Sequence, residues 1–438
     1  MQSLARMAST NSYAETLELP LSYVQARKSL SRKSLAEELA GFREFGQVTR
    51  SLVTAFVDDR GNSREVPTFV NEFWTAKQRQ AHSLHEISYR ACFKPQLPRF
   101  FIERLTQEGE IVYDPFMGRG TTPMEAALLG RLPFGNDVNP LSVVMTKSRL
   151  NPPRLAEVEA RLQEIKLDEP ADMPEDLLAF YHEETLRAIS SLKKYLAMRR
   201  RTYGLDAVDE WIELVALNRL TGHSPGFFSV YTMPPNQAVS AKAQRKINEK
   251  RKQTPPKRDV AKIILRKSRI LLSDLSGPGR AMLASASKEA KLLTHTADAT
   301  PEIGAKSVAL VVTSPPFLNV VQYADDNWLR CWLLGIDPKG VKLTVPKKLD
   351  EWKVEMTKVF RELNRVLKPG GHVAFEVGEV HARKTKLEEA VLPCGVAAGL
   401  EPLLVVINDQ KFTKTANCWG VDNNFKGTNT NRIVVFKK

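Results

Sequence analysis

The sequence has few cysteines and no long apolar run, and each absence excludes a class of protein. Its four cysteines in 438 residues are too few and too widely spaced for a disulfide framework or a paired-cysteine zinc site, so we expect buried thiols and no metal. No stretch approaches the roughly 18 consecutive apolar residues of a membrane-spanning helix. The first residues also lack the pattern of a secretory signal. The default expectation is therefore a cytoplasmic protein with no membrane partner.

What the sequence does have is an excess of positive charge. It contains 64 Lys and Arg against 50 Asp and Glu, a net charge of +14. Residues 242–269 hold 12 basic and two acidic side chains, so +10 of this charge lies in 28 residues. A solvated hairpin broken at Pro255 and Pro256 is one interpretation. The other is contact with nucleic-acid phosphates. The candidate contacts are Lys246, Lys250, Arg251, Lys252, Lys257 and Arg258.

Strands and helices alternate in two separated parts of the chain. Residues 111–113 form a short apolar run that ends at Asp114. A glycine-rich turn, a helix over 121–129 and a second strand ending at Asp137 follow. After a long interruption, further strands are predicted over 308–313, 372–377, 403–407 and 432–436. This order is typical of an α/β fold with a parallel sheet.

The interruption between the two parts has a helical pattern. Leu155, Val158 and Leu162 fall on one face of an amphipathic helix, and a longer candidate helix contains Leu186 and Leu196. We therefore expect three units in the chain. They are an N-terminal region of unassigned role over 1–84, a sheet domain made of 85–150 and 285–438, and a mainly helical insertion over 151–284 that contains the basic segment.

The turn after the first strand has the composition of a cofactor loop. It reads Asp114-Pro115-Phe116-Met117-Gly118-Arg119-Gly120-Thr121-Thr122. Its two glycines let the backbone approach a ligand, and a helix N-terminus follows them. Asp137 comes 17 residues after Gly120, where a carboxylate can accept hydrogen bonds from both ribose hydroxyls. Pro123 stands where a dinucleotide motif has a third glycine, which disfavours NAD. Asp114 favours a cofactor with a cationic amine over one with a pyrophosphate.

A second motif, Thr313-Ser314-Pro315-Pro316-Phe317, directly follows the apolar strand over 308–313. Two consecutive prolines make the backbone rigid and extended, and they leave carbonyl groups free to accept hydrogen bonds. Ser314 adds a hydroxyl group and Phe317 a flat aromatic face. These groups can hold an exocyclic amino group by its two hydrogens while its ring stacks on the phenylalanine.

Together the two motifs resemble those of the S-adenosylmethionine-dependent DNA amino-methyltransferases, which methylate cytosine N4 or adenine N6. The catalytic loop of that family reads Ser, Asp or Asn, then Pro-Pro, then Tyr or Phe. The resemblance implies a Rossmann-like class I methyltransferase sheet with a helical insertion as the target-recognition region. It also implies that Ser314, Pro315, Pro316 and Phe317 are catalytic.

The resemblance further implies which residues bind S-adenosylmethionine. Asp137 takes the ribose, Asp298 accepts from the adenine amino group, and Phe93-Lys94-Pro95 resembles the element that closes over the methionine moiety. The residues implied at the methionine end of the cofactor are Asp114, Phe116, Gly118 and Gly120. Thr121 and Thr313 are also assigned to the cofactor site.

The implied activity is direct methyl transfer to a base flipped out of double-stranded DNA, without a covalent enzyme intermediate. Ser314 before the two prolines favours cytosine N4 over adenine N6, because a hydroxyl is the family's commoner choice there. An RNA exocyclic-amine methyltransferase and an inactive nucleic-acid-binding member of the fold are the alternatives. A separately encoded restriction endonuclease stays open as a partner.

Overall fold

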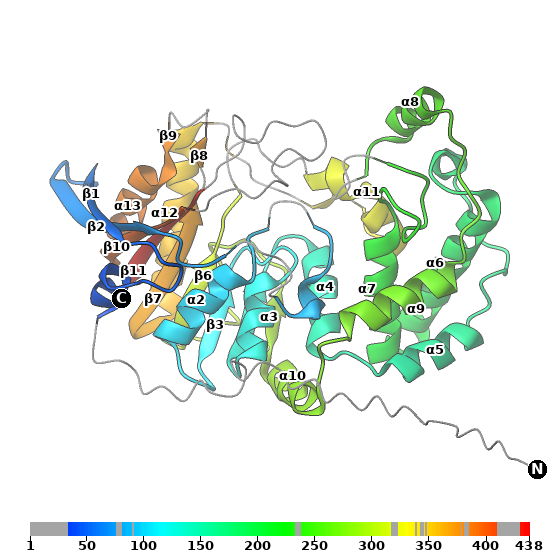
Figure 1. Cartoon of the computed structure of the whole chain (residues 1–438), viewed down its shortest axis with the longest axis horizontal. Helices are drawn as coiled ribbons and strands as arrows, with labels where there is room; N and C mark the ends of the chain where they lie inside the picture. Colours follow the sequence, from blue (N-terminus) through cyan, green and yellow to red (C-terminus); the bar gives the residue numbers. More distant parts are fainter. Residues whose placement is uncertain are drawn as a thin grey trace, which may run out of the picture.

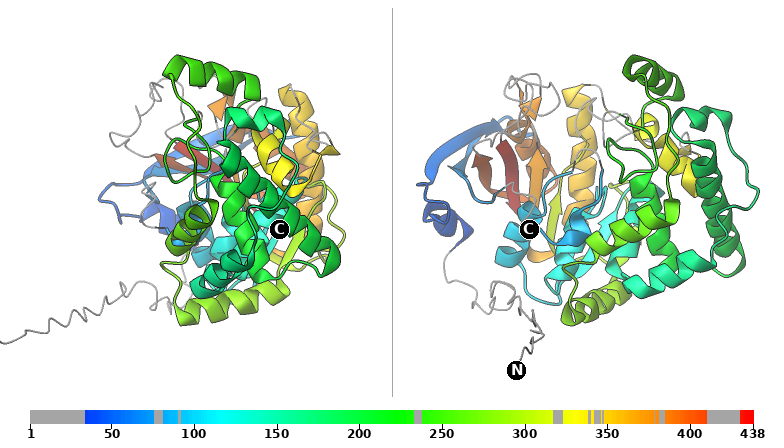
Figure 2. Two further views of the ribbon diagram at one scale, coloured as in Figure 1. Left: turned by 90° about the vertical axis from the view of Figure 1, so that its right-hand side faces the viewer. Right: turned by 45° about the vertical axis from the view of Figure 1, so that its right-hand side comes forward.

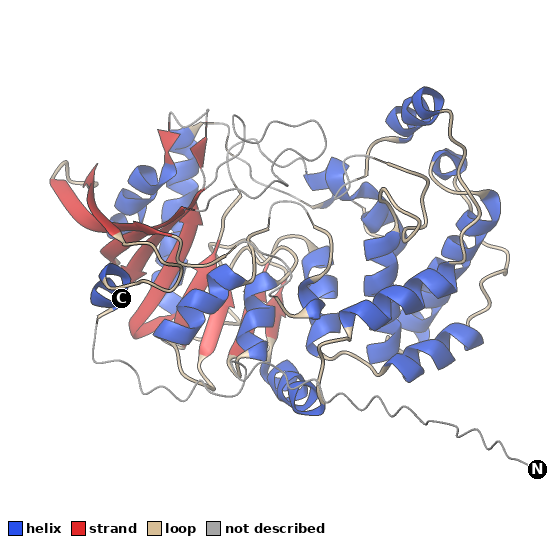
Figure 3. Ribbon diagram, viewed as in Figure 1, coloured by secondary structure: helices blue, strands red, loops and turns tan. Residues whose placement is uncertain are grey.

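The computed structural model describes residues 34–75, 81–89, 92–232, 238–316, 323–337, 340–341, 346, 348–377, 379–380, 385–409 and 430–438. A large sheet with helices on both faces forms one part of the molecule, and a group of helices forms the other (Figures 1 and 3). Ser314, Pro315 and Pro316 are among the described residues, whereas Phe317 lies outside them.

The sheet has nine strands in the described part of the chain. Their order is β1 (Arg50–Val57), β2 (Ser63–Asn71), β10 (Glu401–Asp409), β11 (Thr430–Lys437), β7 (Leu367–Val377), β6 (Val308–Thr313), β3 (Ile111–Asp114), β4 (Leu132–Asn136) and β5 (Lys291–Leu293). The strands from β7 to β5 run parallel, and β11 is antiparallel to both of its neighbours. This topology confirms the predicted α/β, Rossmann-like sheet.

Helices cover both faces of the sheet because buried side chains alternate along its strands. On β6, Leu310 and Val312 pack in one cluster with α2 (Gln96–Leu105), while Val311 packs in another with α12 (Leu349–Val366). The other helices near the sheet are α1 (Leu35–Ala40), α3 (Thr121–Leu128), α4 (Pro140–Leu150), α10 (Gly277–Glu289) and α13 (Leu387–Ala397). A small ribbon of β8 (Glu379–Val380) and β9 (Thr385–Lys386) follows β7.

A third apolar cluster holds the helical region together. It contains buried residues of α5 (Leu155–Glu164), α6 (Glu183–Thr202), α7 (Ala207–Arg219) and α9 (Val260–Leu271). The short helix η4 (Glu175–Ala179) and α8 (Ala241–Arg251) complete the region, and Figure 2 shows its helices from the side.

One further helix of this region comes from beyond the predicted insertion. Leu329 and Leu333 of α11 (Tyr323–Leu334) are buried in the helical cluster, although α11 follows the catalytic motif in the chain. No helix in the described ranges is long and apolar enough to cross a membrane.

Candidate active site

The glycine loop turns tightly after β3 and lies against β4 and α4. Gly118 and Gly120 adopt φ of +50° and +75°, a region that other residues rarely enter. A Cβ atom on Gly120 would lie 2.1 Å from Oγ1 of Thr146. The N–H of Met117 donates to the carbonyl of Asn136 at 2.9 Å, which joins the loop to the end of β4. Both glycines are therefore required by the loop itself.

Asp137 lies directly after β4 and accepts two backbone hydrogen bonds, one on each carboxylate oxygen. Gly118 N donates to Oδ2 at 2.9 Å, and Asn139 N donates to Oδ1 at 3.0 Å. Burial raises the pKa of Asp137. Because each carboxylate oxygen has two acceptor sites, both oxygens can still accept a hydroxyl. The site therefore fits a ligand with two adjacent hydroxyl groups.

A hydrogen bond joins the predicted cofactor loop to the predicted catalytic motif. Thr313 Oγ1 donates to Oδ1 of Asp114 at 2.6 Å, although the two residues lie 199 positions apart in the sequence. Phe116 N donates to the same oxygen at 3.0 Å. Asp114 is 1% exposed, and burial raises its pKa to about 7. Because β3 and β6 are parallel, the two motifs that follow them meet at the carboxyl ends of these strands.

The catalytic motif itself is held by groups that the sequence analysis did not identify. The Ser314 hydroxyl lies close to the carboxylate of Glu376, near the end of β7, and acts to lower the pKa of that carboxylate. Asn431 Nδ2 of β11 donates to Oε1 of Glu376 at 2.5 Å, and burial raises the pKa of Glu376 to about 7. The indole N–H of Trp352 donates to the Pro316 carbonyl at 3.1 Å. Glu376 could have been found in the sequence, because it is a carboxylate near the end of the strand predicted over 372–377.

Asp298 lies in the loop after β5, and its side chain is exposed. That loop is held beside β4, because Asn136 Nδ2 donates to the His295 carbonyl at 3.0 Å and His295 N donates back to Asn136 Oδ1 at 2.9 Å. Asp298 and Asp137, which are predicted to bind the adenine and the ribose, therefore follow the carboxyl ends of two neighbouring strands.

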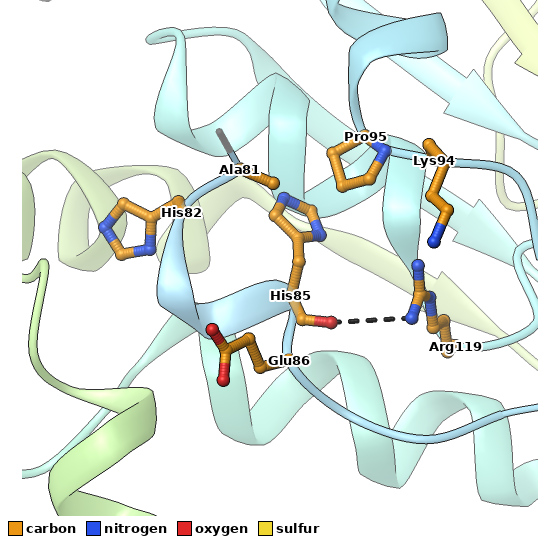
Figure 4. A pocket seen from close by; sticks show the side chains of 7 residues that line it. All are labelled: Ala81, His82, His85, Glu86, Lys94, Pro95 and Arg119. Atoms are coloured by element: carbon orange, nitrogen blue, oxygen red, sulfur yellow. Dashed lines mark hydrogen bonds between the residues drawn. The ribbon is translucent and has the colours of Figure 1, made fainter. Parts of the chain in front are cut away.

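Two buried arginines tie the segment before α2 to the predicted cofactor loop, and Figure 4 shows one of them, Arg119, donating to the His85 carbonyl. Arg119, within the loop, donates to the carbonyl of Ile87 at 2.9 Å and to that of Phe93 at 3.4 Å. Arg149 of α4 donates to the Leu84 carbonyl at 3.2 Å. The Phe93-Lys94-Pro95 element thus begins beside the glycine loop. Lys94, Pro95 and Arg119 line a pocket there, together with Ala81, His82, His85 and Glu86.

Part of the chain is similar in sequence to known methyltransferases. Residues 9–147 match the family model for DNA methylases. The type II methyltransferase M.BsoBI of Geobacillus stearothermophilus is 24% identical over 315 residues, which are 64% of this chain and 58% of that protein. The type II methyltransferase M.MvaI of Kocuria varians is 30% identical over 128 residues, 28% of this chain and 25% of that protein. The chain thus matches little more than half the length of the longer-matching relative.

Solved structures with a similar fold have low scores. TrmN from Thermus thermophilus aligns with a TM-score of 0.32 and 12% identity, over 82% of this chain and 53% of that one. The rRNA methyltransferase aviRa from Streptomyces viridochromogenes aligns with a TM-score of 0.31 and 13% identity, over 81% and 89%.

The basic segment lies outside residues 9–147 and forms α8 and most of α9. Lys246, Lys250, Arg251 and Lys252 are exposed. Helix α8 lies on the same side of the molecule as β8 and β9, which follow the carboxyl end of β7 (Figure 1). Helix α8, which holds part of the basic segment, and the predicted catalytic motif are therefore on the same side.

The other two predicted phosphate contacts differ from these four. Lys257 forms an ion pair with Glu184 of α6, and Arg258 is only partly exposed. The guanidinium of Arg251 also has a partner, since it lies 3.7 Å from the ring centre of Tyr231. Lys246 and Lys250, four residues apart on α8, are therefore the clearest candidates for contact with phosphates.

Proposed function

We propose that this chain is an S-adenosylmethionine-dependent DNA methyltransferase that methylates an exocyclic base amine, with cytosine N4 as the favoured target. The observation that carries the proposal is the 2.6 Å hydrogen bond from Thr313 to Asp114, which joins the cofactor loop to the Ser-Pro-Pro motif. The match of residues 9–147 to DNA methylases and the type II methyltransferase relatives support it. A separately encoded restriction endonuclease remains a proposed partner.

The residues present fit the cofactor. Asp137 has acceptor capacity for two ribose hydroxyls, and Asp114 offers a carboxylate to a cationic amine beside the glycine loop. Asp298, in the loop after the neighbouring strand β5, would accept from the adenine amino group. When bound, S-adenosylmethionine would supply a sulfonium methyl group. Phe116 in the same loop and Thr121, the first residue of α3, complete the proposed cofactor site.

The target base would be held by the Ser-Pro-Pro-Phe motif. Ser314 Oγ and the Pro315 carbonyl accept the two hydrogens of the base amine, and Phe317 stacks on the ring. Pro316 keeps this segment extended, and its carbonyl is fixed by the indole of Trp352. Catalysis then depends on position and on exclusion of water, with no covalent bond between the base and the protein.

Glu376 sets the direction of the Ser314 hydroxyl in this scheme. As a carboxylate it accepts the Ser314 O–H, so both lone pairs of Oγ are free to face the base amine. A protonated Glu376 is a poorer acceptor for that hydroxyl. Asn431 fixes the carboxylate from the opposite side. Glu376 is therefore a positioning residue for Ser314.

Replacing Glu376 with glutamine should change the pH dependence of methyl transfer. Burial raises the pKa of Glu376 to about 7, so in the wild-type protein turnover at saturating cofactor should fall as the pH drops through 7. Glu376→Gln removes this titration and should flatten the acid limb of the profile. The measurement is kcat against pH between 5.5 and 8.5 (roughly 1.5 pH units either side of that pKa). An acid limb unchanged in the variant would assign the titration to another group.

Neutralising two exposed lysines of α8 should weaken DNA binding through its salt dependence. If Lys246 and Lys250 each contact a phosphate, the Lys246→Gln, Lys250→Gln variant should lower the slope of log K against log salt by about 2. The matched control replaces Lys288 and Lys306, which are exposed but lie beside the amino ends of β5 and β6. Equal slopes in the two variants would indicate that α8 is a solvated surface helix that does not contact phosphates.

The nucleic acid itself is tested by label transfer. The full chain is incubated with methyl-labelled S-adenosylmethionine and either duplex DNA or RNA. Label in DNA supports the proposal, and label confined to RNA favours the RNA methyltransferase alternative. Cofactor and DNA binding with no transfer to either substrate would instead indicate an inactive nucleic-acid-binding protein.

A further inference from the structure

Strand β1 ends the sheet with an unusually apolar edge. Within the described residues β1 pairs with β2 alone, so its outer backbone groups have no strand partner. Residues 51–57 carry no charge. Leu52, Val53 and Val57 are 52%, 61% and 59% exposed. An edge strand with seven successive uncharged residues is a template for pairing with another strand.

The opposite edge of the sheet differs in length and in charge. Strand β5 has three residues and begins with the exposed Lys291, so it is short and carries a charge. Short edge strands and lysines are the usual protection against strand addition. Of the 11 large hydrophobic residues exposed in the described chain, five lie between Phe45 and Val57. The apolar exposure is thus concentrated at β1.

We propose that β1 pairs antiparallel with β1 of a second copy of this chain, about a twofold axis at Thr54. Thr54 is the midpoint of the uncharged residues 51–57. Antiparallel pairing about it places every uncharged residue of one copy opposite an uncharged residue of the other, and it places Arg50 opposite Asp58. The twofold axis produces this charge pairing twice, which is the self-complementarity that an isologous interface needs.

The surroundings of β1 leave room for a partner. The Arg50 side chain is 65% exposed although it pairs with Asp409 at 3.4 Å, so it can also reach a second acidic group. The β1–β2 hairpin lies at the far end of the sheet from the helical region (Figures 1 and 2). Pairing there would extend the sheet across two copies and leave both helical regions outermost. The inference does not depend on the proposed methyltransferase activity.

Sedimentation equilibrium of the full chain tests the interface. The wild-type mass should approach twice the 49.2 kDa of one chain as concentration rises. Val53→Lys puts a charge in the middle of the edge and should give the mass of one chain. The matched control is Val354→Lys on α12, where a valine is 57% exposed, and it should remain a dimer. A monomeric wild type, or a dimeric Val53→Lys variant, would overturn the proposal.

A cysteine variant tests the register. Residues opposite each other in antiparallel strands have Cβ atoms about 4.5 to 5.5 Å apart, so two copies of Thr54→Cys should form a disulfide on mild oxidation. Two copies of Ser51→Cys would be separated by six residues along the strands, about 20 Å, and should not. The wild-type chain, with its own cysteines, is the control for background. Failure of Thr54→Cys to cross-link would contradict pairing about Thr54, even where the variant is correctly folded.

Discussion

Replacing Asp114 with asparagine should weaken S-adenosylmethionine binding by about 100-fold. A hydrogen bond to a charged group contributes roughly 1.5 to 3 kcal/mol, and the neutral amide of Asp114→Asn no longer attracts a cationic amine. The substitution keeps the size of the side chain and an oxygen that can accept from Thr313. Isothermal titration calorimetry at pH 8 (about one unit above the Asp114 pKa) measures the change in Kd.

The same residue should make cofactor binding depend on pH. Burial raises the pKa of Asp114 to about 7 in the free protein, so affinity should fall as the pH drops below 7 and the carboxylate becomes protonated. Asp114→Asn should not show this fall. The control is Asp409→Asn, which removes an exposed carboxylate from the last residue of β10, as Asp114 is the last of β3. Equal affinity in the Asp114 variant and the wild type would remove Asp114 from the cofactor site.

Replacing Ser314 with alanine should lower kcat by about 100-fold and leave the Kd for S-adenosylmethionine nearly unchanged. The expected size corresponds to one hydrogen bond made to the reacting group in the transition state. The alanine also leaves Glu376 without the Ser314 hydroxyl, but Asn431 still donates to it. Single-turnover kinetics and calorimetry separate the two effects.

Ser307 provides the matched control for Ser314. It directly precedes β6, whereas Ser314 directly follows it, so the two serines mark opposite ends of one strand. Ser307→Ala should retain full turnover. Phe317→Ala should resemble Ser314→Ala, with slow transfer and intact cofactor binding. A loss of cofactor affinity in both Ser314→Ala and Phe317→Ala would mean that this segment belongs to the cofactor site.

The central strands β3 and β6 could be predicted from the sequence, because each is an apolar run directly followed by a recognisable motif. The strand predicted over 308–313 matches β6, and the turn after β3 begins at Asp114 as expected. The third parallel strand was missed, since β5 has only three residues and no apolar run. The β1–β2 hairpin was missed for another reason. Residues 51–53 are exposed in succession, so β1 lacks the alternation that marks a half-buried strand.

The remaining parts of the site depend on contacts between distant segments. Glu376 meets Ser314 because β6 and β7 pair in a register that aligns Thr313 with Phe375, and no local pattern encodes that register. The sequence analysis assigned no role to Arg119, yet its side chain donates to the carbonyl of Ile87. Lys257 counted toward the basic charge, but Glu184, 73 residues earlier, neutralises it. The composition predicts the net charge of the segment, but tertiary packing determines which of its basic side chains already pair with a carboxylate.

Identification of the methylated nucleoside is the most direct test of the proposed activity. Duplex DNA is incubated with the full chain and S-adenosylmethionine, digested to nucleosides and analysed by mass spectrometry against authentic standards. We predict N4-methylcytosine in the wild-type reaction and its absence with Ser314→Ala, while N6-methyladenine would transfer the proposal to the second amine target. C5-methylcytosine would contradict direct transfer to an exocyclic amine, because a carbon target requires chemistry that Ser314 and its neighbours do not provide.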